Sequence, residues 1–205
     1  MELTTLQIDE KMRMITLDIK DMYVNLPIEG ILQTTNFWLN RNSNNSKQVK
    51  QQTLSIILTL IKQNYFQYSG EIYQPNKGIA MGSAISSTTA EIYIQYFESL
   101  HVKHWLESSE ILFYKRYVDD IFIVYDTSKT NAQNIFNEIN KIDPDLQFKI
   151  TNETDNVITY MDLSISRNNN KLELGIYRKP IETGTVIHFN SIHPYEQKCR
   201  LSYTI

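Results

Sequence analysis

Tyr117-Val118-Asp119-Asp120 is the stretch that decides the fold of this chain. It lies between two short runs rich in β-branched and aromatic residues, 111–118 and 121–125. Strands favour such residues and Asp tolerates the tight backbone of a turn, so the pattern predicts a β-hairpin whose turn carries paired carboxylates. A bare Asp-Asp pair is more often a solvated acidic turn, and a third carboxylate must separate the two interpretations.

The paired carboxylates of Asp119 and Asp120 repel each other unless a positive charge lies between them. Hard oxygen ligands of this kind suit Mg²⁺ or Mn²⁺. Asp18 supplies the third carboxylate, because it alternates along the predicted strand 12–19 with residues of the opposite face. That opposite face is aliphatic: Ile15, Leu17 and Ile19. If the strand lies beside the hairpin, the three aspartates meet on the open face of a sheet and hold two ions.

The remaining pattern predicts an α+β fold, an antiparallel sheet with helices packed on one face. Two helices are expected within 28–64, the second with a buried stripe of Val49, Thr53, Ile56, Ile57, Leu60 and Ile61. A hairpin follows at 65–74, then a glycine turn and long helix at 78–107, the aspartate hairpin at 111–125, a further helix, and strands at 157–177.

The glycine turn contains Gly82 and Ser83, just before the long helix. Small hydroxyls and free amides at a helix start can receive a phosphate or a nucleic-acid backbone. Close packing of helices explains the same small residues equally well.

At 205 residues the chain is long enough for one sizeable domain. Its net charge of −3 and pI near 5.8 count against a free-standing nucleic-acid binder, and fit a piece of a larger protein. A single cysteine, Cys199, excludes an internal disulfide, and the longest apolar run is too short to span a bilayer. We therefore expect a soluble intracellular protein, in nucleus or cytoplasm, with no membrane partner.

The order and spacing of Asp18, Tyr23, Gly82-Ser83 and Tyr117–Asp120 resemble the palm motifs of reverse transcriptases. Within that class the chain resembles the Penelope-like retroelements. The strings that carry this second resemblance are Leu17-Asp18-Ile19-Lys20-Asp21-Met22-Tyr23 with Asn25-Leu26-Pro27, Gly78-Ile79-Ala80-Met81-Gly82-Ser83, Tyr114-Lys115-Arg116-Tyr117-Val118-Asp119-Asp120, Tyr160-Met161-Asp162-Leu163, Ile176-Tyr177-Arg178-Lys179-Pro180, and Asn190-Ser191-Ile192-His193-Pro194 with Lys198.

The resemblance implies a polymerase palm with a ferredoxin-like core over 1–180 and the start of a thumb at 181–205, with the fingers largely absent. It implies RNA-directed DNA polymerase activity for a retrotransposon, with an RNA template, a DNA primer, deoxynucleoside triphosphates and two Mg²⁺ or Mn²⁺ ions. The fingers, thumb and endonuclease of a longer polyprotein would be its partners.

The resemblance also implies roles for single residues. Asp18, Asp119 and Asp120 would be catalytic and, with Ile19, would form the metal site, in which Asp18 and Asp119 would be the main ligands and Asp120 would contribute charge beside them. Nucleotide contacts would come from Lys20, Asp21, Met22, Tyr23, Gly82 and Ser83, with Tyr23 as the steric gate against a ribose. The primer grip would be Tyr160, Met161, Asp162 and Leu163, and Lys149 is a possible general acid.

Other interpretations stay open at this point. Tyr23 is also compatible with a core aromatic, Lys149 with a solvated strand residue, and Arg178 and Lys179 with either phosphate contacts or a solvated strand end. A catalytically silent retroelement remnant that binds nucleic acid weakly is the alternative function. A viral RNA-dependent RNA polymerase shares the carboxylate logic but fits Tyr23 poorly.

Overall fold

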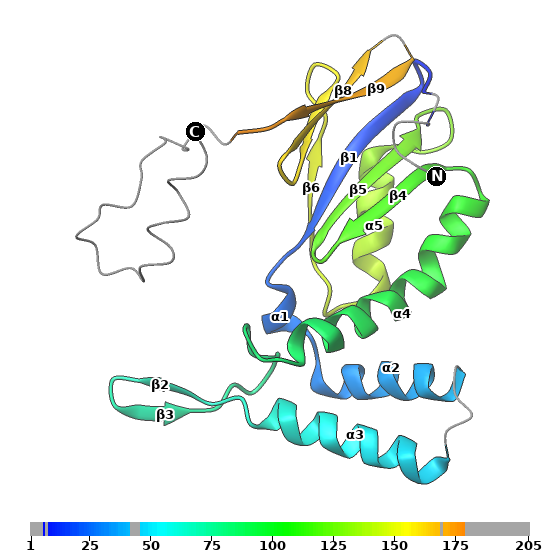
Figure 1. Cartoon of the computed structure of the whole chain (residues 1–205). Helices are drawn as coiled ribbons and strands as arrows, with labels where there is room; N and C mark the ends of the chain where they lie inside the picture. Colours follow the sequence, from blue (N-terminus) through cyan, green and yellow to red (C-terminus); the bar gives the residue numbers. More distant parts are fainter. Residues whose placement is uncertain (1–5, 7, 42–45, 169, 179–205) are drawn as a thin grey trace.

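The computed structural model describes residues 6, 8–41, 46–168 and 170–178, and it is built around one four-stranded antiparallel sheet (Figure 1). The strands lie in the order β4-β5-β1-β6. Their bounds are β1 Met12–Ile19, β4 Ile111–Tyr117, β5 Asp120–Asp126 and β6 Phe148–Asn152. With helices between β1 and β4 and between β5 and β6, this is the β-α-β-β-α-β order of a ferredoxin-like core. The predicted α+β fold is confirmed.

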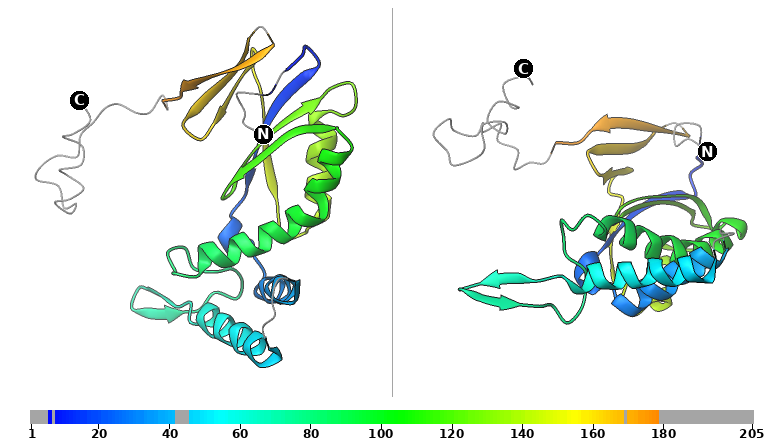
Figure 2. Two further views of the ribbon diagram at one scale, coloured as in Figure 1. Left: turned by 45° about the vertical axis from the view of Figure 1, so that its right-hand side comes forward. Right: turned by 60° about the horizontal axis from the view of Figure 1, so that its bottom comes forward.

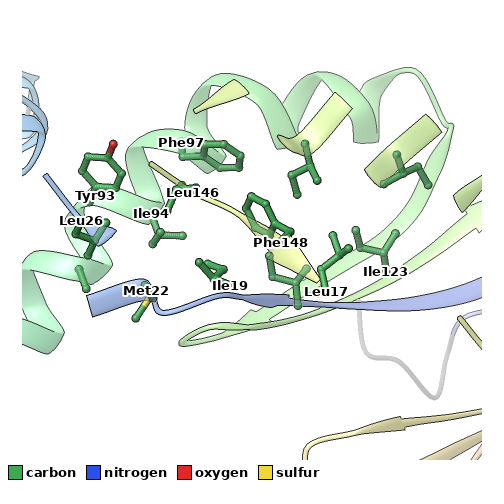
Figure 3. Close-up of a cluster of buried hydrophobic side chains, with 14 of the residues drawn as sticks. Leu17, Ile19, Met22, Leu26, Tyr93, Ile94, Phe97, Ile123, Leu146 and Phe148 are labelled. Carbon is green, nitrogen blue, oxygen red and sulfur yellow. The ribbon is translucent and has the colours of Figure 1, made fainter. Parts of the chain in front are cut away.

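Helices α4 (Ser86–Glu107) and α5 (Ala132–Ile142) cover one face of the sheet. The alternation of β1 turns its aliphatic side chains to this face, where Ile15, Leu17 and Ile19 are buried. Figure 3 shows Leu17, Ile19 and Phe148 of the sheet packed among side chains of α4. Fully burying an aliphatic side chain contributes roughly 1.5–3 kcal/mol, so this core fixes the sheet against the helices.

The sequence predicted that the opposite face of the sheet is open. This is wrong for one end of that face, which is covered. A second, three-stranded sheet lies over one end of it, formed by β7 (Val157–Tyr160), β8 (Leu163–Asn168) and β9 (Lys171–Ile176) (Figure 2). A separate apolar cluster joins the two sheets: Leu6, Ile8, Met14, Phe122, Val124, Ile158, Ile165 and Leu172. The cover exists because β1 and β5 carry apolar side chains on both faces at this end. Towards the other end the same face becomes charged.

Three further helices and a hairpin lie between β1 and α4: α1 (Met22–Asn25), α2 (Ile28–Arg41), α3 (Lys47–Lys62), β2 (Phe66–Tyr68) and β3 (Glu71–Tyr73). The β2–β3 hairpin projects away from the other elements (Figures 1 and 2). The predicted buried stripe of α3 is wrong for Val49, Ile56 and Leu60, which are exposed, whereas Ile61 is buried. The reason is that α3 lies at the periphery against α2, so only a narrow side of it is covered.

Within the described residues, no helix is long and apolar enough to cross a membrane. The predicted start of a thumb at 181–205, Lys179 and Cys199 lie outside the described residues.

Candidate active site

Four residues form a row across the sheet at its charged end. Asp18 on β1 is the register partner of Asp120 on β5 and of Lys149 on β6. Asp120 is in turn the register partner of Tyr117 on β4. Such partners in antiparallel strands point to the same face, with Cβ atoms about 4.5–5.5 Å apart. The structure therefore brings together two of the three predicted carboxylates and the predicted basic residue Lys149.

Asp119 is joined to β1, next to Asp18, by a backbone hydrogen bond. Val118 and Asp119 form the two-residue turn between β4 and β5, and the amide of Ile19 donates to the Asp119 carbonyl at 3.0 Å. The sequence placed both aspartates in the turn, and this is wrong for Asp120, which is the first residue of β5. A turn of only two residues leaves no room for it, and its place in the strand is what sets it opposite Asp18.

The donor set suits a hard cation. Asp18 and Asp120 present carboxylate oxygens on one face, and Asp119 directly precedes Asp120. Carboxylate oxygens are the ligands that Mg²⁺ and Mn²⁺ prefer. Across the part of the chain that the structure describes, no group of three or more His, Cys, Asp or Glu side chains is placed to hold a metal ion. By geometry the fit thus rests on the adjacent pair Asp18 and Asp120.

The predicted nucleotide-binding segment 20–23 follows directly after β1. Lys20 and Asp21 are exposed, and Asp21 has a φ of 46°, which turns the chain sharply into α1. Met22 is buried in the main core, while Tyr23 is only partly buried. Met22 and Tyr23 help to line a cavity of about 430 Å³ between α4 and the aspartate hairpin, whose other walls include Glu91, Arg116 and Val118.

The two glycines of the glycine turn do different things. Gly82 has a φ of 90° and open space where a Cβ would stand, and Ser83 beside it is exposed. Close packing therefore does not explain Gly82. Gly78, at φ 83°, does pack closely: a Cβ there would lie 2.5 Å from the carbonyl oxygen of Val24, and the next amide, of Ile79, donates to the Tyr23 carbonyl at 2.8 Å. Gly78 thus seats the turn against the Tyr23 backbone, a role that no residue spacing indicated.

The predicted primer grip is the turn between β7 and β8. Tyr160 and Leu163 are register partners, and Met161 and Asp162 between them are exposed. The ring of Tyr160 lies 5.5 Å from that of Phe122, and its hydroxyl donates to the Asp120 carbonyl at 3.3 Å. Burial, and next the negative charge of Asp120, raise the pKa of Tyr160 to about 12. The hairpin is therefore attached to β5, the strand that carries Asp120.

Arg116 is a residue of this region to which the sequence assigned no role. Its side chain is buried between β4 and α4, where it is paired with Glu91 and Glu98. The hydrogen bond from Arg116 is the main cause that lowers the pKa of Glu91. Two glutamates seven residues apart lie on one side of a helix, and that spacing, opposite a strand arginine, was the available signal.

Comparison with known proteins identifies a family that matches this chain. A family model described as reverse transcriptase (RNA-dependent DNA polymerase) matches residues 3–162. No curated protein matches. Among solved structures, apo telomerase from Candida tropicalis aligns with a TM-score of 0.65 at 14% identity over 82% of this chain and 33% of that one. Its form truncated from the C-terminal domain aligns with a TM-score of 0.60 at 16% identity, over 79% and 35%.

Telomerase from Candida albicans, in complex with a TWJ fragment of telomeric RNA, aligns with a TM-score of 0.60 at 14% identity over 83% of this chain and 32% of that one. At such identities the likeness is one of fold. The chain spans about a third of the length of these structures.

Proposed function

Because this chain belongs to the reverse transcriptase (RNA-dependent DNA polymerase) family, we propose that it is the palm of an RNA-directed DNA polymerase. The reaction is attack of a DNA primer 3′-hydroxyl on the α-phosphate of a deoxynucleoside triphosphate, directed by an RNA template. The observation that carries the proposal is the register pairing of Asp18 with Asp120, which sets two carboxylates on one face beside Lys149.

Two divalent ions, Mg²⁺ or Mn²⁺, belong to this proposal. Asp18, Asp119 and Asp120 would hold them, with Ile19 at the same site. When bound, such ions stabilise the charge that develops on the attacking and leaving oxygens in phosphoryl transfer. The exposed face and the hard oxygen donors of Asp18 and Asp120 support this assignment.

The remaining residues of the row and its surroundings serve the substrates. Lys149 gives a proton to the departing pyrophosphate, a role supported by its exposed position beside Asp18. Tyr23 limits the space under the sugar and so selects deoxynucleotides, with Lys20, Asp21 and Met22 near the triphosphate. The open space at Gly82, with the exposed Ser83 beside it, admits the template and the incoming base. The hairpin Tyr160 to Leu163 directs the primer end.

The wider setting is also proposed. The motif strings favour a Penelope-like retroelement as the source, acting inside the cell in DNA integration. Since the matched part of this chain covers only about a third of the structures it resembles, we propose that fingers and thumb segments, and an endonuclease, act together with this palm.

The test is primer extension by the purified chain on an RNA template with deoxynucleotides and Mg²⁺ or Mn²⁺. We compare it with Asp119→Asn/Asp120→Asn, which keeps side-chain volume and removes two charges. The matched control is Asp155→Asn, in an exposed turn at the far end of the second sheet. We expect extension by the wild type and the control, and none by the double variant.

Extension by the double variant would contradict the proposed site. A folded wild-type chain that extends no primer would mean that this palm is not a polymerase by itself. Ribonucleotides as efficient as deoxynucleotides would contradict the role of Tyr23.

A further inference from the structure

Arg116 is held by α4 through every nitrogen of its guanidinium. Its Nε donates to Glu98 at 2.7 Å, one terminal nitrogen donates to Glu91 at 2.9 Å, and the other donates to Glu91 at 2.8 Å and to Glu98 at 3.0 Å. The side chain of Arg116 is 7% exposed. Tyr114, two residues earlier on β4, also donates to Glu98, at 2.9 Å. A guanidinium gripped by two carboxylates has little freedom to rotate.

The same guanidinium also reaches the aspartate hairpin. The terminal nitrogen that donates to Glu91 also donates to the carbonyl of Val118 at 3.0 Å. Val118 has a φ of 54°, a left-handed conformation that a β-branched residue rarely adopts. Such a conformation persists only where surrounding contacts over-determine it. Arg116 provides one of these contacts.

The next residue provides a further contact. Asp119 accepts a hydrogen bond from the Ile19 amide at 3.0 Å, which joins the turn to β1 directly after Asp18. An unbroken set of contacts therefore runs from Glu91 and Glu98 through Arg116 and the turn to β1. The carboxylate pair Asp18 and Asp120 lies next to its last bond.

We infer that Arg116 is a positioning residue: clamped by Glu91 and Glu98, it holds the Val118–Asp119 turn so that Asp120 stays opposite Asp18. The consequence for catalysis rests on the proposed polymerase function, whereas the structural statement does not. The competing explanation is that Arg116 only ties β4 to α4, as any buried ion pair ties two elements.

A second buried arginine gives a matched control. Arg167 on β8 is 9% exposed and donates to Glu153, itself 9% exposed, at 3.1 Å through Nε. It belongs to the second sheet, and within the described residues its side chain bonds to Glu153 and Asn156, away from the aspartate turn. Replacing it with lysine removes a buried bidentate pair without touching that turn.

The experiment is amide hydrogen exchange by NMR on the whole chain, read at Ile19. Lys20, whose amide donates to Gln147 on the other side of β1 at 2.8 Å, is the internal reference. For Arg116→Lys we expect the exchange of Ile19 to accelerate at least tenfold relative to Lys20. For Arg167→Lys we expect that ratio to stay at its wild-type value. Should Arg116→Lys fail to fold, Glu98→Gln, which keeps the shape of the clamp, is expected to change the ratio in the same direction.

An unchanged ratio in Arg116→Lys, or an equal change in Arg167→Lys, would overturn the inference. Because exchange needs no catalysis, this holds even if the chain extends no primer. If the chain is an active polymerase, we further expect Arg116→Lys to lower kcat with little change in KM for the deoxynucleotide. Primer extension together with an unchanged Ile19 ratio would leave the proposed function standing and remove the positioning role alone.

Discussion

Two hairpins in this protein share one backbone design and differ in their side chains. In Tyr117-Val118-Asp119-Asp120 and in Tyr160-Met161-Asp162-Leu163 the outer residues are register partners across a two-residue turn. The first turn residue is left-handed in both, with φ of 54° and 55°. In both, the backbone carbonyl of the turn aspartate accepts a hydrogen bond from an amide at or just beyond the end of a neighbouring strand. The Ile19 amide donates to Asp119 at 3.0 Å, and the Tyr177 amide donates to Asp162 at 2.8 Å.

The differences decide what each hairpin can do. The first ends in Asp120, beside Asp18, where the second has the apolar Leu163. The first is also bonded by Arg116 at its turn. The turn geometry is therefore a scaffold that both hairpins share. The proposed metal site needs one feature more, a carboxylate at one register position opposite a second carboxylate, and the first hairpin alone of these two has it.

Replacing Asp120 of the first hairpin with leucine, the residue at the matching position of the second, should have the largest effect on activity. Asp120→Leu removes a carboxylate to which the proposed mechanism assigns a role in the transition state, so we expect primer extension to fall on the order of 10²–10³-fold, and Mn²⁺ binding to weaken. Extension assays and Mn²⁺ titration by electron paramagnetic resonance measure both. The compensating Asp120→Leu/Leu163→Asp variant should stay inactive, because Leu163 is not opposite Asp18; recovered activity would refute the importance of register.

The two tyrosines that open the hairpins should differ in their contribution to stability. Tyr160→Phe removes the bond to the Asp120 carbonyl, and we expect the free energy of unfolding to fall by about 0.5–1.5 kcal/mol. Tyr117 is 59% exposed, so Tyr117→Phe should stay within about 0.5 kcal/mol of wild type. Urea denaturation compares them, and equal losses would mean that the bond contributes nothing.

Titration should detect the same contact. Ultraviolet difference spectra of wild type minus Tyr160→Phe should show a tyrosine with a pKa of about 12. The raised pKa stabilises the fold up to the ordinary value of 10, and this contribution is lost as pH rises from 10 towards 12. Because the charge of Asp120 is the second cause of the shift, Asp120→Asn should lower the pKa while burial keeps it above 10. A pKa of Tyr160 that does not change in Asp120→Asn would show that the charge of Asp120 does not act on Tyr160.

The smallest effect concerns the clamp, which only the first hairpin has. Arg116 lowers the pKa of Glu91 below its ordinary 4.5, so the stabilisation is complete above that value and is lost as pH falls through the lowered one. We expect Glu91→Gln to destabilise the chain by a constant amount from neutral pH down to about 5, and by less below 4.5. Chemical denaturation at several pH values measures this, and a pH-independent difference would contradict the pairing.

Local pattern was sufficient to predict β1, the aspartate hairpin and α4. Alternation set Asp18 on the face away from Ile15, Leu17 and Ile19, and the composition around Asp119 and Asp120 marked two strands. These signals act between near neighbours in sequence. The adjacency of Asp18 and Asp120 then followed from pairing two strands that local pattern had already indicated.

What the sequence missed depends on contacts between distant segments. The clamp on Arg116 needs a helix 18 and 25 residues away to lie against β4. The tight seat of Gly78 needs the carbonyl of Val24. In α3, Ile56 and Leu60 have helical periodicity but lie where no layer of the described structure covers them. Periodicity shows which side of an element is apolar, and only tertiary packing shows whether that side is covered.

Strand β5 is buried on both faces from 121 to 125. A strand with alternating character resists slippage, because a shift by one residue exposes its apolar side; β5 gains no such protection from its composition. A gene copy that lost one codon in this run would still encode an apolar strand. After such a deletion, either the end of β5 at Asp126 or the end at Asp120 would have to shift its pairing by one residue. A shift at the Asp120 end would turn Asp120 towards the helices. Such a descendant could keep its hydrophobic core while losing its chemistry in a single deletion.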